Sequence, residues 1–123
     1  MLQDEKIIGF LMTTDAVRAR GFYEGVLGLA VVADDDFALV LDANGTMVRV
    51  SKTKDFIPAQ HTVLGWAVGD IAAEVRALHT KGVTFERYGF LKQDDAGSWT
   101  APGGTQVAWF KDPEGNVLSL TQF

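Results

Sequence analysis

Short apolar runs alternate with polar joints through the first half of the chain, around one amphipathic segment. Residues 7–12 form an apolar run with β-branched side chains, which predicts a strand. Asp15 suits a helix N-cap, and the pattern predicts a helix over 16–27 that ends at Gly28. Further strands are expected over 29–32, 37–41 and 46–51. The last two are joined by Asn44-Gly45, a strong hairpin signal because both residues tolerate positive φ.

The same order of elements repeats in the second half. Residues 62–68 predict a strand, and Asp70 is a second N-cap. The helix that follows presents one apolar face at intervals of four and three residues and ends at Gly82. Strands are expected over 83–88, 106–110 and 117–123, with a looser segment over 89–98. A turn over 112–116 joins the last two, because proline fixes φ and the following glycine accepts positive φ.

The matching landmarks indicate an internal duplication. Asp15 and Asp70 lie 55 residues apart, and Gly28 and Gly82 lie 54 apart. We therefore expect an α+β fold made of two paired βαβββ modules, over about 6–51 and 60–123, with a linker at 52–59. Together they would form a single domain over 1–123, with a curved mixed sheet, helices on its outer side and a concave pocket within.

Composition narrows the classes of function. Apolar residues make up 47% and charged residues 22% of 123 residues, as in ordinary globular domains. The absence of cysteine excludes disulfides, zinc ribbons and thiol nucleophiles. A formal net charge of −5 with scattered bases argues against nucleic acid as a partner, and no apolar run is long enough to cross a membrane. The acidic start differs from a secretory signal, so we expect a cytoplasmic protein.

Three short motifs resemble the vicinal oxygen chelate superfamily, which contains glyoxalase I, bleomycin-resistance proteins and extradiol dioxygenases. The motifs are Asp15 followed by Phe22-Tyr23 and Leu27-Gly28-Leu29, then Val68-Gly69-Asp70-Ile71, then Asp112-Pro113-Glu114-Gly115-Asn116. The resemblance covers nearly the whole chain. It implies paired βαβββ modules that half-enclose a pocket, and a homodimer.

The resemblance also locates the positions where metal-using members carry His, Glu or Gln ligands. The corresponding residues here are Ile8, Arg49, Val63 and Ser119. A divalent cation needs several converging N or O donors, which this set does not supply. His61 shares a strand face with Val63 if that strand extends so far, but one imidazole is not a site. We therefore expect no metal and no cofactor.

Strand alternation suggests which side chains line the pocket. Phe10 and Met12 share one face of the first strand, and we place His61, Val63 and Ser119 on corresponding faces of later strands. Arg49 stands in an otherwise apolar strand, where an inward guanidinium would need an anionic partner. The alternative is an outward, solvated arginine, since one register step reverses the face.

Aromatic and amide side chains in the long second-half loop are further candidates. Tyr88, Gln93 and Trp99 would contact a ligand if this loop forms a lid or pocket wall. The alternative is a surface loop pinned by its aromatic residues. We place Trp66 on the opposite face, under a helix, and assign Trp109 to the core.

These observations lead to three alternative functions. The first is metal-independent binding of a small organic molecule, with anions and drug-like compounds as candidates, in the sheet cavity through Arg49 and the residues above. The second is a lyase, isomerase or dioxygenase of the glyoxalase type, with or without metal. The third is a dimeric interaction module without a small-molecule ligand.

Overall fold

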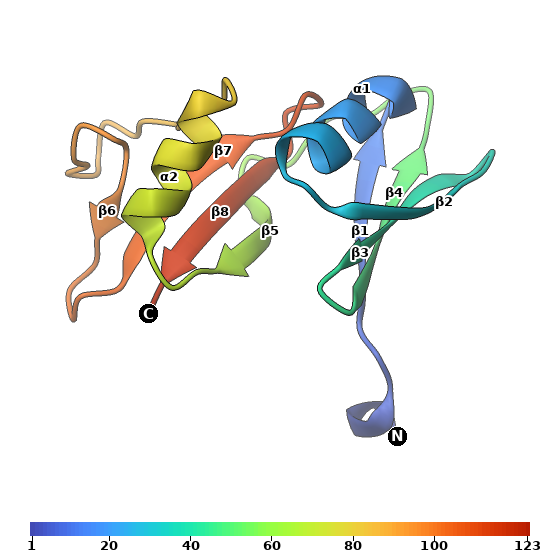
Figure 1. Cartoon of the computed structure of the whole chain (residues 1–123), viewed down its shortest axis with the longest axis horizontal. Coiled ribbons are helices and arrows are strands. Elements are labelled where there is room, and N and C mark those ends of the chain that lie inside the picture. Colours follow the sequence, from blue (N-terminus) through green and yellow to red (C-terminus); the bar gives the residue numbers. More distant parts are fainter. The chain divides into compact units, whose positions relative to one another are not determined.

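The computed structural model describes all 123 residues, which divide into two compact units, Met1–Ile57 and Pro58–Phe123. In the first unit, a short 3₁₀ turn η1 (Leu2–Asp4) precedes strand β1 (Ile8–Thr13) (Figure 1). The remaining elements are α1 (Ala16–Arg20), the π-helical η2 (Gly21–Val26), β2 (Ala30–Asp34), β3 (Ala38–Ala43) and β4 (Thr46–Lys52). No helix has the length and apolar character required to span a bilayer.

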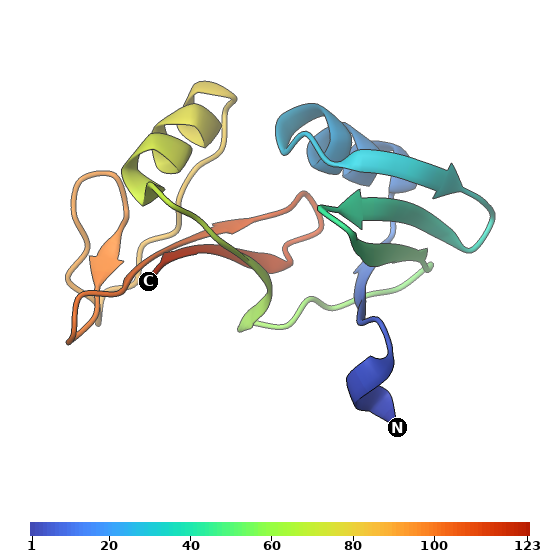
Figure 2. The same cartoon turned by 60° about the horizontal axis from the view of Figure 1, so that its bottom comes forward.

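The first sheet has the strand order β1-β4-β3-β2. β1 is parallel to β4 because the helix carries the chain back between them, whereas the other pairs are antiparallel. α1 lies against one face (Figure 2), and this face carries the fully buried core. Its members are Leu11, Leu39, Leu41, Val48 and Val50, each at most 4% exposed.

The predicted helix over 16–27 forms, but its second half is π-helical. The Asp15 carboxylate accepts a hydrogen bond from the Arg18 amide at 3.1 Å, as expected of an N-cap. From Gly21 onward the turns widen, and the Leu27 amide bonds to the Phe22 carbonyl five residues back. Two glycines in this segment weaken its preference for the α-helix, and the Tyr23 side chain within it is fully buried.

The second unit repeats the topology of the first. Its elements are β5 (Thr62–Ala67), α2 (Ile71–Thr80), β6 (Trp99–Thr100), β7 (Gln106–Lys111) and β8 (Val117–Gln122). The strand order is β5-β8-β7-β6, which matches the first sheet position by position. The Asp70 carboxylate caps α2 by accepting from the Ala73 amide at 3.1 Å. Two four-stranded mixed sheets, each with its own helix, confirm the predicted α+β class and βαβββ modules.

The predicted turn before the last strand is held by one carboxylate. Asp112 accepts hydrogen bonds from the backbone amides of Glu114 and Asn116 and from the Asn116 side chain, at 2.8–3.0 Å. Gly115 has a φ of 96°, a conformation that favours glycine. The motif thus fixes how the chain enters β8, the central strand of the sheet that pairs with both β5 and β7.

The prediction of a strand over 83–88 is wrong. Those residues are irregular, and the two-residue β6 takes the first of the three strand places after the helix. The Glu86 amide donates to the Trp109 carbonyl at 2.7 Å, on the same edge of β7 that β6 occupies further along. The Glu86 carbonyl accepts a hydrogen bond from the Gln93 side chain, which takes the place of a hydrogen bond to a neighbouring strand.

Charged side chains tie the open end of β2 to its neighbours. Asp34 accepts from Lys52 at the end of β4 at 2.8 Å, and from Arg20 at 3.4 Å. The hydrogen bond from Lys52 is the main reason why the pKa of Asp34 lies below its ordinary value. These exposed contacts link β2, β4 and the end of α1.

We expect Asp34→Asn to destabilise the protein at neutral pH, because the amide cannot form these ion pairs. The lowered pKa means that the stabilisation is complete above the unfolded-state pKa of about 3.9 and is lost as pH falls through the folded-state pKa. Urea unfolding of both proteins at about pH 7 and about pH 3 measures the difference. Asp36→Asn, at an exposed neighbour, is the control. An Asp34→Asn deficit that is equal at both pH values would contradict the assignment.

Candidate functional site

The face of the first sheet that α1 leaves uncovered carries the residues predicted to line a pocket. We call it the first open face. It contains Phe10 and Met12 of β1, and Arg49 of β4 lies directly beside Phe10 in the ladder. Phe10 is 65% exposed, whereas the core residues between these positions are buried. The register therefore places Arg49 with Phe10 and Met12, on the face opposite the core.

Arg49 is a half-buried cation in apolar surroundings. Its neighbours across the strands are Phe10 on one side and Val40, which is buried, on the other. Arg49 forms no ion pair with a carboxylate of its own unit. Its charge helps to lower the pKa of Asp35, but the backbone amides of residues 37 and 38 contribute more. The guanidinium therefore has hydrogen-bonding capacity that its unit does not saturate.

The second unit has a comparable uncovered face, the second open face. Gly65, Ser119 and Trp109 lie side by side across β5, β8 and β7. A Cβ at Gly65 would lie 2.6 Å from the Ser119 Oγ, so the glycine leaves that hydroxyl room. Val63, 37% exposed, lies where the register between β5 and β8 shifts.

Three aromatic rings gather on the second open face. The Trp109 ring lies 5.4 Å from Tyr88 in an edge-to-face arrangement and 6.2 Å from Trp99, measured between ring centroids. Burial raises the pKa of the Tyr88 hydroxyl, and the charge of Glu86 adds to this. The structure thus brings Tyr88 and Trp99 together through Trp109.

The assignment of Trp109 to the core is wrong, because the side chain is only half-buried on the open face. Its neighbours Ala108 and Phe110 are fully buried, so alternation along β7 turns Trp109 to the other side. That pattern is visible in the sequence and could have identified Trp109 as a candidate. Trp66, in contrast, stacks on Phe110 at 6.3 Å on the core side, as predicted.

Gln93 and His61 have different surroundings. The Gln93 amide nitrogen donates to the carbonyls of Glu86 and Gly97, and its oxygen accepts from the Tyr88 amide. These bonds, at 2.7–2.9 Å, close the loop that carries Tyr88. His61 is exposed and immediately precedes β5.

The four positions at which the resemblance implies metal ligands do not fit a divalent cation. Ile8 and Val63 offer hydrocarbon, Ser119 a neutral hydroxyl, and Arg49 a positive charge. The chain contains no group of three or more His, Asp or Glu side chains placed to hold a metal. The donor set therefore suits an anionic group at Arg49 better than a cation.

Comparisons with known proteins agree with this fold. The family model of the Glyoxalase/Bleomycin resistance protein/Dioxygenase superfamily matches residues 7–120. A member of that superfamily from Sphaerobacter thermophilus DSM 20745 has a similar structure, with TM-score 0.77, 21% identity and complete coverage of both chains. A glyoxalase family protein from Enterococcus faecalis has TM-score 0.72 and 20% identity, covering 98% of this chain and 99% of that one.

A lactoylglutathione lyase from Agrobacterium tumefaciens is similar at TM-score 0.74 and 14% identity, covering 97% of this chain and 93% of that one. A search of curated protein sequences finds no significant match. At these identities the structural likeness shows the fold alone.

We expect Gln93→Ala to lower the free energy of unfolding by about 1–3 kcal/mol, because it leaves part-buried backbone groups without partners. Hydrogen exchange at the Tyr88 amide should become faster, since that amide loses its acceptor. Lys92→Ala, at the exposed neighbouring position, is the matched control. Unchanged unfolding and unchanged Tyr88 exchange would show that Gln93 does not hold the loop.

Proposed function

Since the chain belongs to the Glyoxalase/Bleomycin resistance protein/Dioxygenase superfamily, we propose that it binds a small organic anion on its open sheet faces without a metal ion. The observation that carries this proposal is Arg49. Arg49 is a cation on an apolar strand surface, at a position where relatives are expected to carry a metal ligand. A molecule that binds there must therefore carry a negative charge. The anionic group of the ligand would then pair directly with the guanidinium, and no metal ion would be needed between them.

The chemistry of Arg49 favours a carboxylate or a similar planar anion. A guanidinium presents its donors as a rigid fork that matches two carboxylate oxygens. Half-burial beside Phe10 and Val40 reduces competition from water and strengthens such a pair. Phe10, 65% exposed on the same face, offers an apolar contact for the body of the ligand.

The aromatic cluster of Tyr88, Trp99 and Trp109 supports a ligand that contains rings. Rings of this kind stack on flat ligands and bury large areas with little loss of side-chain freedom. Ser119, next to Trp109 in the ladder, adds a hydroxyl to this mainly apolar face. Each open face thus offers its own kind of contact, a charge on the first and aromatic surface on the second.

We further propose that the protein forms a homodimer. β1 is an edge strand of its sheet, and large apolar side chains are exposed where it begins, with Ile7, just before the strand, 79% and Ile8 44% exposed. Exposed apolar edges of this kind favour association between chains. The third possible function, an interaction module, would be favoured over ligand binding if a dimer formed and no compound bound.

We expect Arg49→Leu to weaken binding of an anionic ligand by about tenfold or more, because hydrogen bonds to a charged group contribute about 1.5–3 kcal/mol. Aromatic and aliphatic carboxylates are first screened by their effect on Tm, which a ligand of the folded state raises. Calorimetry then gives Kd for each variant. Arg49→Lys should give an intermediate affinity, since it keeps the charge and loses the fork.

The control is Lys54→Leu, which removes one positive charge at an exposed position of the same unit. It should leave Kd unchanged. If Arg49→Leu binds every ligand as tightly as the unaltered protein does, Arg49 is not part of the binding site and the proposal fails.

A further inference from the structure

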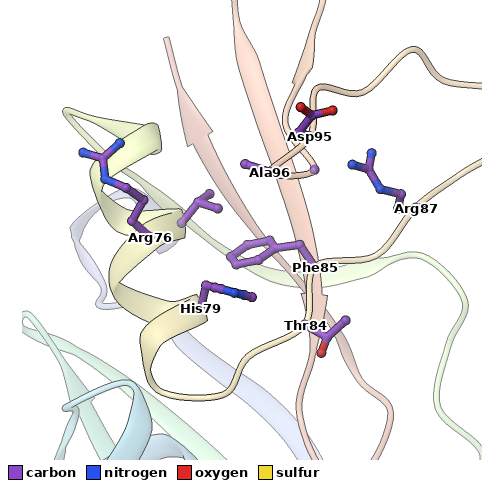
Figure 3. A pocket seen from close by; sticks show the side chains of 9 residues that line it. Arg76, His79, Thr84, Phe85, Arg87, Asp95 and Ala96 are labelled. Atoms are coloured by element: carbon purple, nitrogen blue, oxygen red, sulfur yellow. The ribbon is translucent and has the colours of Figure 1, made fainter.

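A cavity lies in the Pro58–Phe123 unit, between α2 and the loop that follows it. Its volume is about 300 Å³, at the small end of ligand pockets. Figure 3 shows Arg76 and His79 on the helix side, Arg87 and Asp95 on the loop side, and the Phe85 ring between them. None of these residues belongs to the open faces, so this cavity is separate from the surface described above.

The wall of this cavity is fixed by hydrogen bonds. Arg87 donates to the Asp94 carbonyl at 2.6 Å, and the Asp94 carboxylate accepts from the amides of Ala96 and Ser98. A Cβ on Gly97 would lie 3.0 Å from the Cβ of Phe85, so the loop packs directly against that residue. The cavity is therefore preorganised and does not depend on a ligand to order it.

The Phe85 ring is a fixed aromatic surface within the cavity. Its centroid lies 5.5 Å from that of Phe110, a residue with no exposure, and this contact anchors the ring to the core. Phe85 itself is only half-buried, so part of the ring faces the cavity. A flat ring in the ligand could stack on it.

The lining carries a small positive excess in an acidic protein. The lining contains Arg76 and Arg87 but a single carboxylate, Asp95, whereas the whole chain has a net charge of −5. Arg76 and His79 are three residues apart on α2 and therefore lie on the same side of the helix. Arg87 uses one nitrogen for the Asp94 carbonyl and keeps other donors.

We propose that this cavity binds a small aromatic carboxylate, with its ring on Phe85 and its charge attracted by the arginines of the lining. One negative charge matches the lining, because Asp95 would repel a second one. A dianionic aryl phosphate should therefore bind less tightly than the carboxylate. The site is independent of Arg49, which lies in the other unit.

The test is a titration of the ¹⁵N-labelled full chain with benzoate, phenyl phosphate and cyclohexanecarboxylate. Concentrations up to about 10 mM cover the weak affinity expected of a single-ring ligand. Benzoate should produce saturable shifts in the amides of Thr84, Phe85, Ala96 and Gly97, and Arg49→Leu should leave them unchanged. Cyclohexanecarboxylate, which keeps the charge and loses the flat ring, should bind more weakly.

Removing a positive or a negative charge from the lining should change the affinity for benzoate in opposite directions. Arg76→Gln should weaken benzoate binding by about two- to fivefold, and Asp95→Asn should strengthen it by a similar factor, as for partly exposed ion pairs. Lys81→Gln, an exposed charge just beyond α2 and outside the cavity, is the control and should have no effect. All three positions are exposed, so the variants should fold.

Two results would overturn the proposal. The first is an absence of saturable shifts at residues 84–97 with benzoate. The second is an affinity that is the same in Arg76→Gln, Asp95→Asn and the unaltered protein, which would show that the lining charges do not select the ligand.

Discussion

Each four-stranded sheet is covered by its own helix on one face only. Because side chains alternate along a strand, this determines which residues are buried under the helix and which lie on the uncovered face. On the covered face, residues such as Val50 and Phe110 are fully buried and hold the fold. The residues between them must face the other way. The one-sided core is therefore the constraint that places Arg49 and Trp109 on the uncovered faces of their sheets.

The chemistry of the open faces differs from that of a metal centre. Metal-dependent catalysis needs converging donors, and the four implied positions supply two hydrocarbons, a hydroxyl and a cation. Of these, Arg49 differs most from a metal ligand, because its positive charge repels a cation.

The sequence predicts most of the fold and part of the site. Both N-caps, the glycines that end the helices and the turn at Asp112 are local signals, and the structure confirms them. The prediction of a strand over 83–88 failed because of a side-chain contact that periodicity does not reveal. The Gln93 side chain, seven residues beyond Glu86, donates to the Glu86 carbonyl, which a strand would use for pairing. The cavity beside Phe85 depends on packing between α2 and a loop, which periodicity does not reveal.

Open faces that bind an organic anion through Arg49 should hold no metal ion. Calorimetric titration of the chelator-treated protein with Zn²⁺, Ni²⁺, Mn²⁺ and Fe²⁺, followed by amide spectra of the labelled chain, tests this most directly. We expect no stoichiometric metal binding and no localised shifts around Ile8, Arg49, Val63 or Ser119. One metal ion per chain, with shifts centred on those strands, would contradict it.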